Sequence, residues 1–138
     1  MKIAEKQIEV RYAETDQMGV VYHANYLVWM EVGRAELINQ LGFRYTDMEK
    51  EGVIAPVTDL QISYKKPLRY GETATVRTWI DAYDGIRVTY AYEILTPDGE
   101  LAAIGKTQHV CVKRDSFRPI LIRKYFPSWH EAYERAKK

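Results

Sequence analysis

The stretch that decides the fold class spans residues 25–41 and reads NYLVWMEVGRAELINQL. In a helix, Tyr26 and Met30 share one apolar face because they are four residues apart. Val28 and Val32 make much of the opposite side apolar as well. A helix that is apolar most of the way round is buried on several sides. We therefore expect one long helix enclosed by other elements, and a curved sheet provides such an enclosure.

Capping residues mark the ends of the expected helices. Asn25 is the expected N-cap of the long helix, and Gly42 is the expected left-handed residue that stops it. Near the end of the chain Ser128 stands three residues before Glu131, which is the spacing of a capping box. This spacing predicts a short C-terminal helix.

Alternating apolar residues predict strands on both sides of the long helix. The expected strands span residues 7–12, 53–64, 73–80, 86–94 and 101–113. Tight turns at Asp84-Gly85 and Pro97-Asp98-Gly99 join the later ones, and tight turns require antiparallel neighbours. The order of one strand, a helix and four further strands predicts an α+β fold.

Length and composition exclude several classes of protein. The chain has 138 residues, which fits a single domain over residues 1–138, and its net charge of +1 argues against a nucleic-acid binder. Its single cysteine excludes an internal disulfide framework and a cysteine-only zinc site. No apolar run approaches the roughly 20 residues that span a bilayer, and the first residues lack the apolar core of a signal peptide. We expect a soluble, cytoplasmic protein without integral membrane association.

The residues that favour catalysis lie in the stretch 15–26, TDQMGVVYHANY. It brings Asp16 and His23 into a loop that leads directly into the long helix. The first backbone N–H groups of a helix lack internal partners and stabilise negative charge. A carboxylate beside such a group is a minimal arrangement for acyl transfer or hydrolysis. An equally compatible interpretation has Asp16 as a turn former and Asn25 as a cap.

Other polar residues give weaker signals. Glu31 and Arg34 fall beside the apolar helix face, placed either to pair with each other or to face a polar pocket. His109 and Cys111 are two apart in a strand, too far for a direct nucleophile–base hydrogen bond, so Cys111 is expected as a core or interface residue. His130 is expected to be exposed on the terminal helix. The three histidines lack close ligand spacing, so no metal site is expected.

The stretch 15–26 closely resembles the signature of the 4-hydroxybenzoyl-CoA thioesterase family, a branch of the hotdog-fold acyl-CoA thioesterases. That signature is an acid, two residues, glycine, two apolar residues, an aromatic residue, two further positions and Asn-Tyr. The matching residues here are Asp16, Gly19, Val20, Val21, Tyr22, His23, Ala24, Asn25 and Tyr26. Later segments, 63–67 and 71–72, are similar to further landmarks of the family. A histidine at position 23 is closest to the short-chain acyl-CoA thioesterase branch.

The resemblance implies a hotdog fold, in which five antiparallel strands wrap around one helix and two copies join edge to edge. It implies a homodimer or homotetramer with sites at the subunit interface. Asp16 then matches the catalytic carboxylate, as nucleophile or general base, and the backbone N–H of His23 matches the group that polarises the thioester carbonyl. Tyr22 joins these two in the catalytic stretch. The expected substrate-binding residues are Gly19, Val20, Asn25, Tyr26, Glu31, Lys65, Lys66 and Arg69.

We therefore expect an acyl-CoA thioesterase that hydrolyses a short-chain, medium-chain or aromatic acyl thioester. The basic residues Lys65, Lys66 and Arg69 are candidates for contacts with the phosphates of coenzyme A. No cofactor is expected, since coenzyme A is part of the substrate. Two alternatives stay open: a hydratase or dehydratase that uses His23 with Glu31, and a non-catalytic acyl-CoA-binding domain.

Overall fold

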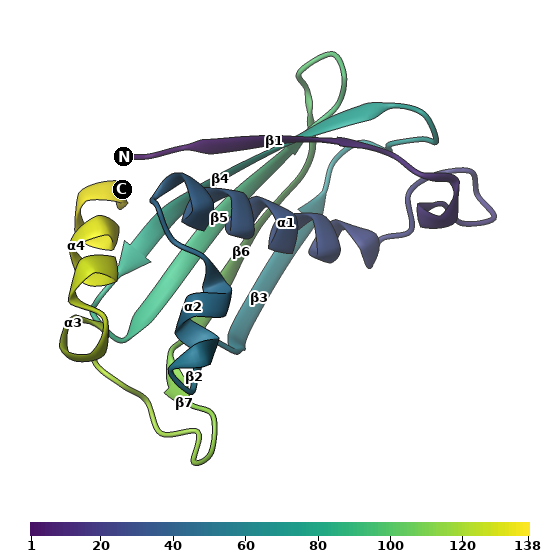
Figure 1. Cartoon of the computed structure of the whole chain (residues 1–138). Coiled ribbons are helices and arrows are strands. Elements are labelled where there is room, and N and C mark those ends of the chain that lie inside the picture. Colours follow the sequence, from purple (N-terminus) through teal and green to yellow (C-terminus); the bar gives the residue numbers. More distant parts are fainter.

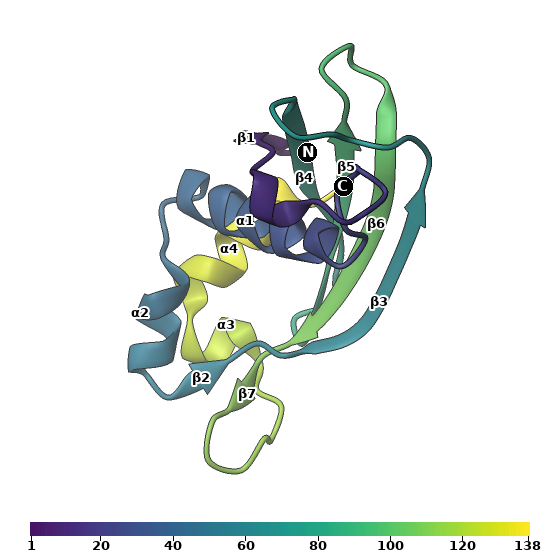
Figure 2. The same ribbon diagram turned by 90° about the vertical axis from the view of Figure 1, so that its right-hand side faces the viewer.

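A curved five-stranded antiparallel sheet carries helix α1 (Asn25–Gln40) on its concave face (Figures 1 and 2). The computed structural model describes residues 1–138. The strands are β1 (Ala4–Glu9), β3 (Val57–Tyr64), β4 (Thr73–Tyr83), β5 (Arg87–Leu95) and β6 (Leu101–Val110). They lie side by side in the order β1-β4-β5-β6-β3. The expected α+β class and the order of strand, helix and four strands are confirmed.

Short elements complete the chain. They are the 3-10 turn η1 (Tyr12–Glu14), α2 (Tyr45–Lys50), β2 (Val53–Ile54), β7 (Val112–Lys113), α3 (Ile122–Tyr125) and α4 (Pro127–Ala136). Strands β2 and β7 pair as a separate two-stranded sheet. The expected strand over 53–64 is therefore broken at Ala55-Pro56, and the one over 101–113 is broken at Cys111. Helix α2 was not predicted, because six residues are too few to reveal a helical period.

Helix α1 approaches strand β4 closely because it carries a glycine at the contact. A Cβ atom on Gly33 would lie 2.7 Å from Cγ1 of Val76, and it would also meet the hydroxyl of Thr78. Met30 makes the corresponding contact with Gly105 of β6, where a Cβ would lie 2.5 Å from the Met30 Cε. Small residues at both contacts thus set the depth at which the helix lies on the sheet.

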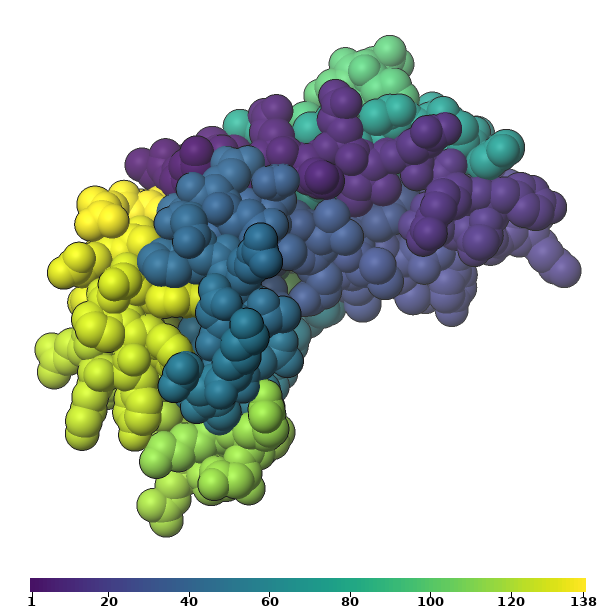
Figure 3. Space-filling model, viewed as in Figure 1, coloured from purple at the N-terminus to yellow at the C-terminus, as the bar shows by residue number.

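One face of α1 stays uncovered, contrary to the expectation that the helix is enclosed on several sides. Val28 is 53% exposed and Val32 is 37% exposed. Figure 3 shows atoms of this helix at the surface of the molecule. The sheet of one chain reaches only the side that carries Trp29, Met30 and Gly33.

The helix ends differ from the predicted caps. The N-cap of α1 is Ala24, and Asn25 is the first helical residue. Gly42 has a φ of +96°, so the predicted left-handed stop is confirmed. Helix α4 begins at Pro127 with Phe126 as its N-cap, so Ser128 makes no cap. Proline suits the first position of a helix because its missing N–H is not needed there.

The C-terminal helix α4 packs against the end of the sheet that lies near the C-terminal end of α1. Trp129 stacks on Phe43 with ring centroids 4.7 Å apart, and the hydroxyl of Tyr133 lies 3.2 Å from that of Tyr90. His130 is half-buried rather than exposed, because its Nδ1 lies 2.7 Å from the hydroxyl of Tyr83. None of the helices is long and apolar enough to cross a membrane.

Candidate active site

The loop between η1 and α1 is a tight reversal that presents Asp16 at its base. The Asp16 N–H donates to the carbonyl of Val20 over 2.9 Å, and the Gly19 N–H donates to the carbonyl of Asp16 over 3.0 Å. Gly19 has a φ of +80°, which is why a glycine suits this position. Residues Thr15 and Val21 close the reversal as an antiparallel bridge. The position of the Asp16 side chain is therefore set by backbone hydrogen bonds.

The Asp16 carboxylate has one engaged and one free oxygen. Its Oδ1 accepts the N–H of Met18 over 2.8 Å, and Oδ2 accepts no hydrogen bond within the chain. The side chain is partly exposed and forms no ion pair. This arrangement combines both alternatives from the sequence, since Asp16 forms a turn and keeps an oxygen available.

Asp16 lines a surface hollow of about 290 Å³ together with residues from two other segments. The lining residues are Asp16, Met18, Val20, Val21, His23, Tyr26, Tyr64, Lys65, Lys66 and Pro67. The hollow thus joins the reversal, the start of α1 and the end of β3. Six of the expected site residues meet here: Asp16, Val20, His23, Tyr26, Lys65 and Lys66.

Backbone donors at the start of α1 are unpaired. Around them, the N–H of Val21 donates to Leu68, and that of Asn25 donates to Tyr22. The N–H groups of His23 and Ala24 donate to no acceptor in the chain. No side chain caps this helix end. The end of α1 beside Asp16 therefore offers free donors together with the positive end of the helix dipole.

Tyr64 is a site residue that the sequence analysis did not single out. Its hydroxyl donates to the carbonyl of His23 over 2.9 Å, and its ring packs edge-on against Tyr26 with centroids 5.2 Å apart. Because Tyr64 ends strand β3, it ties the turn before α1 to the sheet. The two residues are 41 positions apart in the chain, so no local pattern could reveal the contact.

Five expected site residues lie outside the hollow. Asn25 donates from Nδ2 to the carbonyl of Glu14 over 2.8 Å, which is a structural contact. The ring of Tyr22 is exposed and packs beside His23 with centroids 4.4 Å apart. Gly19 shapes the reversal, and the N–H of Arg69 donates to the carboxylate of Glu72. The fifth residue is Glu31.

Comparison with known proteins identifies the family of the chain. The family model described as the Thioesterase-like superfamily matches residues 10–130. The chain belongs to this superfamily. It is 63% identical over 138 residues to a Bacillus subtilis protein named "Putative acyl-CoA thioesterase YneP", and the match covers all of both chains. It is 32% identical over 124 residues to the 1,4-dihydroxy-2-naphthoyl-CoA hydrolase of Thermosynechococcus vestitus, with 89% of this chain and 85% of that one covered.

A solved structure has the same fold. The DHNA-CoA thioesterase of Staphylococcus aureus superposes with a TM-score of 0.95 and is 52% identical, with 98% of this chain and 91% of that chain covered. The expected hotdog fold is thereby confirmed, as is the expected enzyme class of thioester hydrolase.

Glu31 lies away from the hollow lined by Asp16 and forms an ion pair with the buried Arg34. Its Oε2 accepts Nη2 of Arg34 over 2.8 Å. Glu31 lies six residues after Asn25, the first residue of α1, about 9 Å along the helix axis, and His23 lies two residues before that helix. Glu31 pairs with Arg34 and does not line the hollow that contains His23, so one chain does not bring together the two side chains of the hydratase alternative.

The interior beside Arg34 contains no reactive thiol. Burial is the main cause that raises the pKa of Cys111 to about 12, and its Sγ lies 3.8 Å from the sulfur of Met48. His109 is also buried, and burial together with the nearby Arg34 charge lowers its pKa to about 4. Both side chains are thus neutral at physiological pH, and the predicted core position of Cys111 is confirmed.

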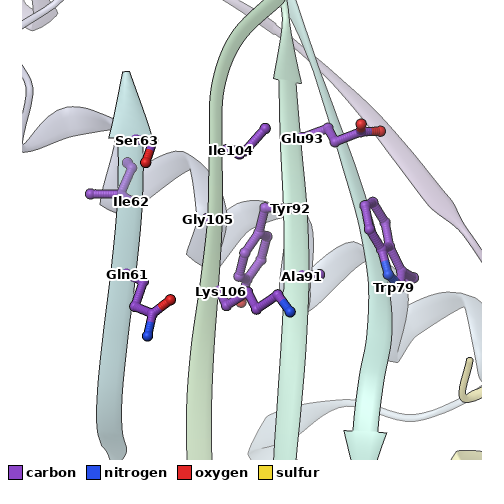
Figure 4. A pocket seen from close by; sticks show the side chains of 10 residues that line it. All are labelled: Gln61, Ile62, Ser63, Trp79, Ala91, Tyr92, Glu93, Ile104, Gly105 and Lys106. Carbon is purple, nitrogen blue, oxygen red and sulfur yellow. The ribbon is translucent and has the colours of Figure 1, made fainter. Parts of the chain in front are cut away.

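A second hollow lies on the sheet face that points away from α1 (Figure 4). Its floor includes Trp79 and the small residues Ala91 and Gly105, with Glu93 and Lys106 at its border. None of the expected site residues lines it. No group of three or more histidine, cysteine, aspartate or glutamate residues in the chain could hold a metal ion.

Proposed function

We propose that this thioesterase hydrolyses acyl-CoA thioesters in the hollow lined by Asp16 and His23, releasing a free acid and coenzyme A. The observation that carries the proposal is that a free carboxylate oxygen of Asp16 lies in one hollow with the helix end that has unpaired donors. The names of the Bacillus and Staphylococcus relatives support the substrate class, since both refer to CoA thioesterases.

In this mechanism the two groups act on opposite sides of the carbonyl. The N–H of His23 donates to the thioester oxygen, where negative charge develops as the carbonyl carbon is attacked. Asp16 either attacks that carbon itself or removes a proton from the attacking water. In both routes the carbon–sulfur bond breaks, coenzyme A leaves as its thiolate, and one water is consumed. When Asp16 attacks, water then hydrolyses the mixed anhydride and restores the carboxylate.

We propose an aromatic acyl group as the preferred substrate. Of the relatives reported above, the Thermosynechococcus and Staphylococcus proteins have names that state an acyl group, a 1,4-dihydroxy-2-naphthoyl and a DHNA thioester. The hollow itself has aromatic walls, because His23, Tyr26 and Tyr64 line it. Rings of this kind favour a flat apolar group through edge-on and offset contacts.

Lys65 and Lys66 are proposed to hold the phosphates of coenzyme A at the rim. Lys66 already pairs with Glu100, whereas Lys65 has no acidic partner in the chain. A free ammonium at the edge of the hollow attracts a phosphate, and the pantetheine arm separates that phosphate from the thioester.

We further propose that the protein works as a homodimer joined along β3. This strand is at the edge of the sheet and has an unpaired side. Leu60 on β3 is 41% exposed, and the exposed residues Val28 and Val32 lie on α1. A second copy that extends the sheet would cover both surfaces.

A thiol-release assay tests the proposed activity. The protein is incubated with benzoyl-CoA, 1,4-dihydroxy-2-naphthoyl-CoA, butyryl-CoA and crotonyl-CoA, and free thiol is measured. We expect release from all saturated or aromatic substrates, with the highest kcat/KM for an aromatic one. Loss of the crotonyl double bond without thiol release would instead establish a hydratase. Binding without either reaction would establish a non-catalytic domain.

A further inference from the structure

We propose that Glu14 is a positioning residue for this hydrolysis, because its side chain and its backbone both hold the Asp16 loop against the start of α1. The inference rests on the function proposed above. Glu14 does not line the hollow, so it acts through the groups that it holds.

The carboxylate of Glu14 joins two segments of the chain. Its Oε1 accepts the backbone N–H of Arg11 over 2.8 Å. Its Oε2 accepts the indole Nε1–H of Trp29 over 2.8 Å, and Trp29 lies in the second turn of α1 with 1% of its surface exposed. The side chain therefore connects the turn before Asp16 to the helix after it.

The backbone of the same residue makes a second connection. The carbonyl oxygen of Glu14 accepts the N–H of Tyr22 and Nδ2 of Asn25, each over 2.8 Å. Tyr22 directly precedes His23, whose N–H is the proposed carbonyl-polarising donor. Asp16 follows Glu14 by two residues. Glu14 is thus connected to both proposed catalytic groups, Asp16 and the N–H of His23, between which the thioester would lie.

The carboxylate of Glu14 has a specific role that packing alone does not explain. Its side chain is almost fully buried, with 6% of the residue exposed, and a buried carboxylate is costly unless donors surround it. Burial alone would raise the pKa of Glu14, but hydrogen bonds from Arg11 and Trp29 outweigh it and hold the pKa below its usual value. The ionised form accepts from two directions at once, which an apolar residue of similar size does not do.

Catalysis is more sensitive to such an anchor than stability is. A displacement of about 1 Å between reacting groups reduces rates by about 100-fold. Glu14→Gln keeps the volume of the side chain but replaces one accepting oxygen by an amide donor, which then faces either Arg11 N–H or Trp29 Nε1–H. We expect this variant to lose about 10-fold or more in kcat while KM stays within about 2-fold of wild type.

A double-mutant cycle tests whether Trp29 is the partner that matters. Trp29→Phe removes the indole donor and is expected to lower kcat by several-fold. In Glu14→Gln/Trp29→Phe the glutamine can turn its amide toward the vacated position, so we expect the double variant to be no slower than Glu14→Gln alone. Additive losses would overturn the proposed connection. Glu131→Gln, an exposed charge removal on α4, is the matched control and should retain wild-type kcat.

Comparison with an Asp16 variant separates an error about Glu14 from an error about the proposed function. Asp16→Asn is measured beside these variants, with circular dichroism and thermal unfolding for each. If Asp16→Asn is inactive while Glu14→Gln changes only Tm and keeps the wild-type kcat per folded molecule, Glu14 is structural and the inference is wrong. If Glu14→Gln does not fold, an unchanged kcat in Trp29→Phe overturns the inference by itself. Wild-type turnover in Asp16→Asn would overturn both.

Discussion

The hydroxyl of Tyr64, at the end of strand β3, forms a hydrogen bond with the backbone immediately before α1. It donates to the carbonyl of His23, so it fixes the peptide plane that follows the proposed oxyanion-stabilising N–H. Removal of this hydroxyl leaves the ring packing with Tyr26 in place. A single hydrogen bond contributes about 1 kcal/mol, so the effect on the site is expected to be measurable and moderate.

We predict that Tyr64→Phe lowers kcat by between about 3-fold and 10-fold, with little change in Tm. Tyr70→Phe is the matched control, since Tyr70 is exposed and its hydroxyl has no hydrogen-bond partner in the chain. Steady-state kinetics on one acyl-CoA substrate gives the comparison. Equal kcat for the two variants would show that this hydroxyl does not contribute to the site.

Lys65 at the rim of the hollow is expected to affect substrate binding rather than turnover. Lys65→Ala should raise KM for an acyl-CoA by about 3- to 10-fold and leave kcat unchanged, because only phosphate binding is lost. The same variant should hydrolyse an acyl N-acetylcysteamine thioester, which has no phosphates, as the wild type does. Lys50→Ala, an exposed lysine on α2, is the control. An equal loss on both substrates would contradict a phosphate contact.

Single residues were predictable where chemistry follows from local sequence. Asp16 and His23 were found because an acid and a histidine precede a helix, and they do line one hollow. Glu14 and Tyr64 were missed, because their partners lie 15 and 41 residues away, and alternation or capping rules describe only neighbours. Asn25 was assigned as a cap, but its side chain reaches back to Glu14 instead.

Helix α1 is the element whose position sets the site, and its contact with β4 depends on Gly33. A Cβ at this position would lie 2.7 Å from Cγ1 of Val76, which is too short for two carbon atoms. In an exposed helix, alanine in place of glycine stabilises by about 1 kcal/mol. At this buried contact the steric cost should exceed that gain.

We predict that Gly33→Ala destabilises the protein by about 1–3 kcal/mol, measured by urea unfolding. Adding Val76→Ala to Gly33→Ala should recover part of the loss, because it removes the closest carbon atom. A more stable Gly33→Ala variant would mean that the helix does not lie as close to β4 as described.

Long elements were predictable because their apolar residues recur with a clear period. The helix over 25–41 and the strands over 73–80 and 86–94 correspond to α1, β4 and β5 with ends shifted by a few residues. Short elements were not: α2 has six residues and β2 and β7 have two each. Pro56 broke the expected strand over 53–64, since proline lacks the N–H that a ladder needs.

A single chain leaves one face of α1 and the edge of β3 uncovered. The sequence predicted a helix buried on most sides, yet one chain leaves Val28 and Val32 exposed. The difference has a simple physical explanation if a second copy covers that face. The apolar residues of the helix would then be buried partly by their own chain and partly by the second copy.

We predict a homodimer or larger homo-oligomer in solution, measured by light scattering after gel filtration. Val28→Asp/Val32→Asp should shift the mass toward that of a monomer, since charges at an apolar interface are costly. Glu36→Gln on a neighbouring turn of α1 is the control and should leave the mass unchanged. A wild-type protein that is monomeric at high concentration would contradict the proposed assembly.

The proposed mechanism depends most on the carboxylate of Asp16, and one kinetic comparison tests this dependence. Asp16→Asn keeps the size of the side chain and an oxygen that can accept the Met18 N–H, so the fold and the reversal should persist. We predict that kcat for the preferred acyl-CoA falls by at least about 100-fold at unchanged Tm, as expected when a nucleophile or general base is lost. Retention of wild-type kcat by folded Asp16→Asn would contradict the proposed mechanism.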